Sequence, residues 1–210
     1  MDELIKLAEM IKDENLRKKV VDFLKNPQLT SKDFKKYKAS DIKEVFTPFS
    51  SVSGSYVVKR DVYKHTIAVV KACLKMAKLI EEVYGLKCDK DALIAGAILH
   101  DIGKIFEWKA EKEKVKHTNI LLDHTTLITA ELYKRNFPEK VIHIVAAHFG
   151  EGGPIPPRNF EAWLLHRIDN MLADLELRIG EPVASPVVLL DEELLRRMDE
   201  AHEGKNKIDK

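Results

Sequence analysis

The stretch LIAGAILHDIGK, residues 93–104, decides the fold that we expect for this chain of 210 residues. Its apolar and small residues up to Leu99 are typical of a helix that is buried on all sides. His100 and Asp101 then emerge from the end of that helix. Burying a carboxylate without a partner costs several kcal/mol, and coordination of a metal ion would offset that cost. The stretch therefore predicts a helical core with a metal site where its central helix ends.

Apolar residues recur at helical spacing over most of the remaining chain. Asp61 is placed to cap a long helix that ends at Gly85, and Asn159 is placed to cap another that is closed by Gly180. No series of alternating apolar and polar residues predicts a sheet. The sequence thus predicts an all-α fold, in which helices pack as a bundle around the buried stretch.

Two segments between the predicted helices are expected to be connections. Residues 47–60 contain Ser, Gly and Pro, which favour loops, and residues 107–117 are mostly charged. Around them we expect three parts of the chain. A helical lead-in at 1–60 packs on the core, the main helical domain occupies 61–180, and residues 181–210 form a C-terminal helix with a frayed tail.

Composition and charge exclude several classes of function. The 35 Lys and Arg residues nearly balance the 34 Asp and Glu residues, so tight nonspecific binding to long nucleic acid is not expected. No basic recognition helix stands out, which argues against sequence-specific DNA binding. No apolar run can span a membrane and the charged N-terminus has no leader, so we expect a cytoplasmic protein without membrane contact. Exposed apolar faces on the terminal helices could pair two chains as a homo-oligomer.

Histidine and aspartate residues come from separate predicted helices or helix ends, and a helical bundle can bring such side chains to one point. Neutral imidazoles and carboxylates together bind divalent Mn, Fe, Ni, Co, Zn or Mg, with one or two ions per chain. A carboxylate can offer one oxygen to each of two ions, and this bridging role suits Asp101. The candidate residues are His65, His100, Asp101, His124, His148 and Asp169.

Part of this set resembles the H…HD…D signature of the HD-domain metal-dependent phosphohydrolase superfamily. The residues that carry the signature are His65, His100, Asp101 and Asp169. The likeness covers about residues 60–178, and LIAGAILHDIGK is its most specific part. Within the superfamily, LLDHTTL at 121–127 and AAHFGEGG at 146–153 are most similar to the HD domain of YhaM-type 3′–5′ exoribonucleases.

The resemblance implies an HD-domain helical bundle with short terminal extensions, and it implies a role for each residue. The four signature residues would hold the first metal ion. Asp101 would also contact a second ion, together with His124 and His148. Water activated by the metal would attack phosphorus, and the ammonium group of Lys104 would contact a phosphate oxygen. Asp101 and Lys104 are thus the expected catalytic residues.

Two departures from the family pattern bear on the substrate. The turn of the family often carries two adjacent histidines, whereas Phe149 follows His148 in this chain. YhaM-type enzymes also carry an N-terminal OB-fold that helps to hold single-stranded RNA, and the helical lead-in before residue 60 has no room for one.

We therefore expect a metal-dependent phosphohydrolase that cleaves a phosphoester of a nucleotide or of short single-stranded RNA. A 3′–5′ exoribonuclease-like phosphodiesterase is the form that the resemblance favours. The neutral charge and the missing OB-fold favour the alternative, a 5′-nucleotidase or a small cyclic-phosphate phosphodiesterase. An alternative of another class is a noncatalytic, metal-stabilised module that senses a nucleotide, although the complete ligand set argues against it.

Several residues near the expected site have more than one interpretation. His166 lies one helical turn before Asp169, so it could orient that carboxylate or contact substrate. Phe106 and Trp108 could stack on a base or pack in the core. Arg167 is expected on nearly the opposite helix face from Asp169, which makes it a poorer candidate for substrate binding.

Overall fold

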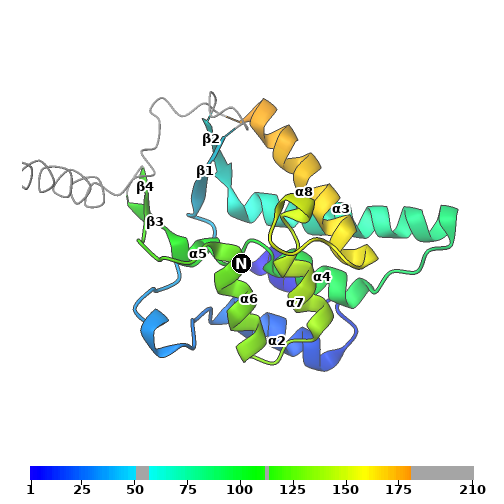
Figure 1. The fold of residues 1–210 in the computed structure, drawn as a ribbon, viewed down its shortest axis with the longest axis horizontal. Helices are drawn as coiled ribbons and strands as arrows, with labels where there is room; N and C mark the ends of the chain where they lie inside the picture. The colour runs from blue at the N-terminus through cyan, green and yellow to red at the C-terminus, as the bar shows by residue number, and fades with distance from the viewer. Residues whose placement is uncertain (51–56, 112–113, 181–210) are drawn as a thin grey trace, which may run out of the picture.

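The computed structural model describes residues 1–50, 57–111 and 114–180 (Figure 1). The described part is all-α apart from two short hairpins, and the predicted fold class is confirmed. The helices are α1 (Asp2–Ala8), α2 (Glu14–Lys25), α3 (Val62–Tyr84), α4 (Lys90–Leu99), α5 (Lys104–Glu107), α6 (His124–Lys134), α7 (Glu139–Ala146) and α8 (Phe160–Ile179). Two 3₁₀ turns, η1 (Lys32–Phe34) and η2 (Gly150–Gly152), lie between them.

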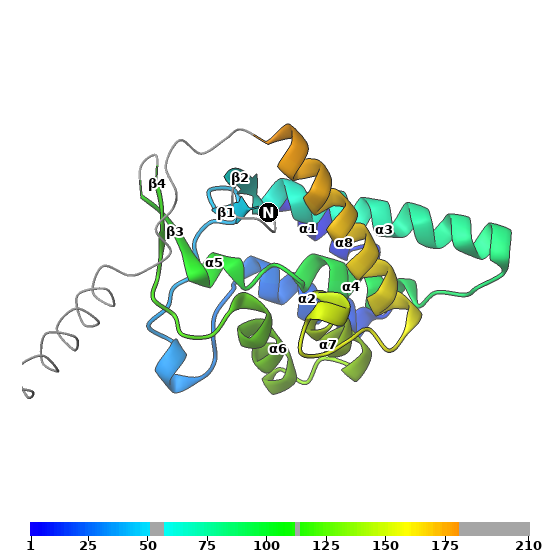
Figure 2. The ribbon, with the colours of Figure 1, turned by 45° about the horizontal axis from the view of Figure 1, so that its top comes forward.

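Helix α4 forms the centre of the bundle (Figure 2). It contacts α1, α2, α3, α7 and α8, and every residue from Ala92 to Leu99 is buried. Gly96 allows α7 to pack closely on α4, because a Cβ atom there would lie 2.3 Å from Cγ2 of Ile144 in α7. The buried central helix that the sequence predicts is therefore present, and it ends at the His100-Asp101 pair.

The predicted caps of the two long helices are also confirmed. The Asp61 carboxylate accepts the N–H of Lys64 at 2.9 Å at the start of α3, which ends at Gly85 with φ 68°. The Asn159 side chain accepts the N–H of Ala162 at 2.8 Å at the start of α8. Helix α3 extends beyond the rest of the bundle at one end (Figures 1 and 2). Helix α8 packs across the part of α3 that lies within the bundle.

Two antiparallel hairpins lie where the sequence predicts connections without regular structure. Strand β1 (Phe46–Ser50) pairs with β2 (Val57–Asp61), and β3 (Trp108–Glu111) pairs with β4 (Lys114–His117). These strands are too short for alternation of apolar and polar residues to reveal them. The prediction of a loop is therefore wrong at residues 47–50 and 57–60, whereas 51–56 lie outside the described residues. The error matters because β2 carries Arg60 into the bundle.

The N-terminal lead-in shares the core of the main domain. Leu4, Phe23 and Ile42 are fully buried in the same cluster as α4. The lead-in is not helical throughout, however, because β1 and most of β2 lie before residue 61. The boundaries of the main domain stay a prediction, and the helix and tail expected at 181–210 lie outside the described residues. In the described ranges, no helix combines the length and apolarity that a membrane crossing needs.

Candidate metal centre

The candidate histidines and aspartates converge where α4 ends. Helix α3 brings His65 and α6 brings His124 to the His100-Asp101 pair, while the turn after α7 and helix α8 bring the remaining two residues. Figure 1 shows these elements around the end of α4. Every one of the side chains is buried or nearly so, although all of them are polar. The convergent residues are His65, His100, Asp101, His124, His148 and Asp169.

The ligand atoms form two groups that share one carboxylate. His65, His100 and Asp101 offer ligand atoms that all lie within 4.8 Å of one another, as do Asp101, His124 and His148. Asp169 joins the first set, because its Oδ1 lies 2.9 Å from Nε2 of His65 and 3.9 Å from Nε2 of His100. The first ligand group comprises His65, His100, Asp101 and Asp169. The second ligand group comprises Asp101, His124 and His148.

The two oxygens of Asp101 face different groups. Its Oδ2 lies 3.6 Å from Nε2 of His100 and 3.9 Å from Nε2 of His65. Its Oδ1 lies 3.3 Å from Nε2 of His124 and 4.0 Å from Nε2 of His148. This arrangement is the one that a carboxylate needs to contact two neighbouring cations.

Each histidine turns Nε2 toward the centre and holds Nδ1 away from it. His100 Nδ1 donates to the carbonyl of Ala97 at 2.8 Å, and His148 Nδ1 donates to the carbonyl of Val145 at 2.7 Å. Both carbonyls lie three residues back in the chain, so the helix ends themselves orient the rings. A proton on Nδ1 leaves the lone pair of Nε2 free to bind a metal ion.

The two other histidines are oriented by carboxylates. His65 Nδ1 lies 3.0 Å from Oε1 of Glu176 in α8, and His124 Nδ1 lies 3.4 Å from Oε2 of Glu107 in α5. Sequence reasoning missed both glutamates. Glu176 lies two helical turns after Asp169 on the same face of α8, and this spacing is a signal that could have found it.

The donor set fits a divalent metal ion. In the described structure, Nε2 of His100 and Nε2 of His124 are buried without a hydrogen-bond partner. A buried polar atom without a partner is costly, and a metal ion would satisfy both lone pairs without requiring a donor proton. Imidazole with carboxylate suits Mn, Fe, Co, Ni or Zn, so these groups could hold a divalent cation.

Two buried cations adjoin the ligand groups. Lys104 Nζ lies 2.6 Å from Oδ2 of Asp101, so Lys104 is not a solvated surface residue. Arg60 Nη2 lies 3.3 Å from Oδ1 of Asp169, and Arg60 Nε lies 2.9 Å from Oε2 of Glu176. Sequence reasoning missed Arg60, since it placed the residue in a loop.

Comparison with known proteins decides the family. The model of the HD domain family matches residues 62–174. The chain belongs to the HD domain family. The match spans every residue of both ligand groups, and the H…HD…D signature predicted from the sequence lies within it. The comparison therefore confirms the resemblance and the implied HD fold.

Relatives of this HD protein include a phosphodiesterase and exoribonucleases. It is 39% identical over 204 residues to the dihydroneopterin 2′,3′-cyclic phosphate phosphodiesterase of Methanocaldococcus jannaschii, which covers 95% of this chain and 80% of that relative. It is 32% identical over 120 residues to the 3′-5′ exoribonuclease YhaM of Listeria welshimeri and of Listeria monocytogenes, over 51% of this chain and 38% of those relatives. No solved structure matches the chain. The protein is a metal-dependent phosphohydrolase of the HD superfamily.

The electrostatics of the HD site keep the central histidines neutral and the aspartates charged. Burial lowers the pKa of His100, and burial together with the nearby His100 lowers the pKa of His148 to about 3. Burial alone would raise the pKa of Asp101, but Lys104 and His100 hold it well below its usual range. Neutral imidazole and ionised carboxylate are the forms that bind a metal ion.

The histidines at the two ends of the site behave differently. Burial lowers the pKa of His65, but hydrogen bonds to Asp169 and Glu176 outweigh it and raise the pKa overall. Burial and Lys104 lower the pKa of His124, but its contacts with Asp101 and Glu107 outweigh them and raise the pKa overall. These two histidines therefore gain a proton more readily than the histidines between them.

His166 does not take the position expected from its spacing. Its Nδ1 donates to the carbonyl of His148 at 2.8 Å, and its Nε2 lies 3.3 Å from Oε2 of Glu151. The side chain faces the turn after α7, so it supports the backbone of one ligand and does not orient Asp169. Arg167 is exposed and pairs with Glu151 at 2.8 Å, away from the ligand groups as expected.

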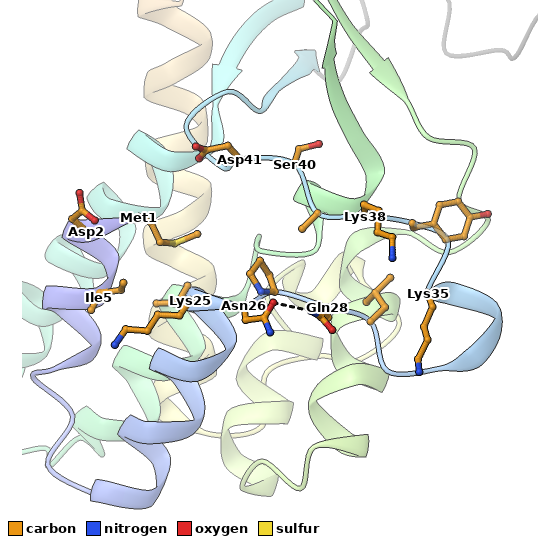
Figure 3. Close-up of a pocket in the computed structure, with 15 residues that line it drawn as sticks. Met1, Asp2, Ile5, Lys25, Asn26, Gln28, Lys35, Lys38, Ser40 and Asp41 are labelled. Carbon is orange, nitrogen blue, oxygen red and sulfur yellow. Dashed lines mark hydrogen bonds between the residues drawn. The ribbon is translucent and has the colours of Figure 1, made fainter.

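The cavity shown in Figure 3 lies apart from this centre. It has a volume of about 750 Å³ and is lined by the start of α1, the end of α2 and part of the segment at 35–41. None of the candidate ligands lines it. The chemistry of the HD site is therefore to be sought at the end of α4 and not in this cavity.

Proposed function

We propose that this phosphohydrolase opens the 2′,3′-cyclic phosphate of a small substrate, with divalent metal ions at the two ligand groups. The observation that carries this proposal is the likeness to the Methanocaldococcus jannaschii cyclic phosphate phosphodiesterase, which extends over 95% of the chain. The likeness to YhaM covers only about half of it. The cyclic-phosphate alternative weighed in the sequence analysis is thereby favoured over the exoribonuclease form.

The ligand groups supply the proposed mechanism. The first group would hold one ion and the second group another, with Asp101 between them. When bound, the metal would supply a water that can lose a proton near neutral pH and attack phosphorus, and it would supply positive charge beside the phosphoryl oxygens. The Nδ1 contacts of the four histidines keep each Nε2 directed at the same region. Arg60 Nη2 contacts Nε2 of His65 and would have to move away from that atom when an ion binds.

Lys104 is the proposed electrostatic catalyst. Its ammonium group is buried and held 2.6 Å from Asp101, beside both ligand groups. A fixed positive charge stabilises the negative charge that grows on the phosphoryl oxygens during attack, and it does so most strongly where water is excluded. Lys104 can therefore contact the substrate phosphate while its side chain stays packed.

The natural metal, the cytoplasmic location and the pairing of two chains stay predictions. Because imidazole and carboxylate suit several ions, Mn²⁺, Fe²⁺ and Zn²⁺ are each supplied in the test of activity. The substrates are 2′,3′-cyclic AMP, dihydroneopterin 2′,3′-cyclic phosphate and a 5′-labelled single-stranded RNA. We expect ring opening of at least one cyclic phosphate to a phosphomonoester, with the RNA left intact.

A variant pair ties the activity to the site. Lys104→Met should lower kcat about 10²-fold, the typical effect of removing a group that stabilises developing charge. Lys64→Met is the matched control, since Lys64 also pairs with an aspartate three residues away but its side chain is 84% exposed. Shortening of the RNA from its 3′ end would instead establish the exoribonuclease function. A protein that binds metal but cleaves none of the substrates would be the noncatalytic module.

A further inference from the structure

Phe149 is an apolar side chain that stays half exposed beside buried ligands. Its exposed fraction is 48%, whereas His124 and His148 are buried. The Phe149 ring centroid lies 4.4 Å from that of His148 and 5.6 Å from that of His124. The ring thus covers part of the second ligand group and leaves about half of its own surface open. Exposed apolar surface at the edge of a site is where a ligand gains from contact.

The turn that carries Phe149 is fixed before any ligand arrives. His166 Nδ1 holds the carbonyl of His148 at 2.8 Å. Gly150 follows with φ +69°, and a Cβ atom there would lie 2.1 Å from the His166 ring. A Cβ atom at Gly153 would lie 2.9 Å from Cβ of Phe149. Because the backbone is tightly packed on both sides, little conformational entropy is lost when a ligand contacts the ring.

Other aromatic residues near the site cannot take this role. Phe106 is fully buried in the core, and Trp108 is buried with its ring against His117 at 5.2 Å. From the sequence, base stacking and core packing were alternatives for both residues. The structure places them in the core, whereas Phe149 is 48% exposed next to a ligand group.

We propose that Phe149 is a stacking platform that selects phosphodiesters carrying a planar heteroaromatic ring, such as a purine or a pterin. This inference rests on the proposed function, since it takes the phosphate to lie beside Asp101 and both ligand groups. The rest of a small substrate then lies beside the second group, where the Phe149 ring is held. Phenylalanine offers no metal ligand, so at this position the chain has a binding surface where the family often has a second histidine.

The test compares a substrate with a ring and one without. Values of kcat/KM are measured for 2′,3′-cyclic AMP and for glycerol 1,2-cyclic phosphate with the wild type, Phe149→Ala and Phe149→Trp. Tyr133→Ala is the matched control, because Tyr133 is an aromatic residue on α6 with an exposed fraction of 76%. Binding of adenosine 2′-monophosphate and glycerol 2-phosphate is measured by calorimetry, which needs no turnover. Circular dichroism checks that each variant is folded.

We compare kcat/KM for 2′,3′-cyclic AMP with kcat/KM for glycerol 1,2-cyclic phosphate. Phe149→Ala should lower the ratio of the first value to the second about tenfold, mainly by raising KM for the substrate with the ring. Phe149→Trp should restore the ratio, and Tyr133→Ala should leave it unchanged. An unchanged ratio in Phe149→Ala, or equal losses on both substrates, would overturn the platform. If the wild type hydrolyses neither substrate, the proposed function fails. The role of Phe149 is then tested by the affinity for adenosine 2′-monophosphate relative to that for glycerol 2-phosphate, compared between the wild type and Phe149→Ala. A tenfold fall in that ratio would support the platform, and no fall would overturn it.

Discussion

The two ligand groups share Asp101 but have different surroundings. The outer members of the first group contact charged side chains. Arg60 pairs with Asp169 and with Glu176, and Glu176 contacts His65. The second group adjoins the half-exposed ring of Phe149, while Lys104 pairs with the Asp101 oxygen that faces the first group. The two sides of the centre therefore differ in their neighbours, which are charged side chains at the first group and a half-exposed aromatic ring at the second.

This difference indicates that the two ligand groups have different roles within the HD site. Arg60 and Glu176 fix the outer ligands of the first group through charged contacts, which suits this group to hold an ion firmly. A group next to open apolar surface is suited to receive substrate. Asp101 belongs to both groups, so its substitution should affect metal binding at both. Substitution of a residue that contacts only one group, such as Glu176, should affect metal binding at that group alone.

The largest effect is expected for Asp101→Ala, which removes a ligand from both groups. We expect kcat for the cyclic phosphate to fall about 10³-fold, while the helical content is kept. Asp174→Ala is the control, since that carboxylate lies exposed on α8 and pairs with Arg178. The measurement is a kinetic assay together with circular dichroism. A variant that unfolds would mean that the metal has a structural role, and activity within a few-fold of the wild type would exclude the shared carboxylate from catalysis.

Arg60→Met should destabilise the metal-free protein by about 2–3 kcal/mol, because it leaves the partly buried carboxylates of Asp169 and Glu176 without their cation. Added Mn²⁺ should recover part of this loss, since an ion at the first group supplies positive charge beside Asp169. Arg178→Met, at an exposed ion pair, should cost less than about 1 kcal/mol. Urea unfolding in EDTA and in Mn²⁺ measures both. Equal losses under the two conditions would show that Arg60 supports the fold and has no part in the first group.

A smaller and more local effect is expected from the carboxylates that orient the histidines. Glu176→Ala should weaken Mn²⁺ binding at the first group, and Glu107→Ala at the second, by about 10–100-fold. The corresponding glutamine variants should recover part of the affinity, because an amide oxygen still accepts from Nδ1. Glu82→Ala, an exposed residue of α3, is the control. Calorimetric titration resolves the two sites. Both variants weakening the same site would contradict the separation of the groups.

The central helix and its ligands could be predicted from sequence because each signal is local. The apolar run that ends in His100-Asp101 predicts both a buried helix and a buried charge. The caps Asp61 and Asn159 are predicted from the residues that directly follow them. The grouping of the ligands was expected only from the likeness to a family, since no spacing along the chain relates His124 to His148.

The residues that were missed depend on contacts between distant segments. Arg60 lies in a strand too short to recognise, and only the packing of β2 against α8 brings it to Glu176. His166 has the right spacing to reach Asp169, but the turn after α7 lies closer to its ring. The exposure of Phe149 follows from the same turn. Helical periodicity carries no information about such contacts.

The most direct test of the shared carboxylate is the number of Mn²⁺ ions that each chain binds, counted by native mass spectrometry. We expect two ions per chain in the wild type, as a carboxylate-bridged centre requires, and one ion when His124 and His148 are both replaced by alanine. A wild-type chain that binds a single ion, and keeps it in the double variant, would contradict the arrangement in which Asp101 joins two ligand groups.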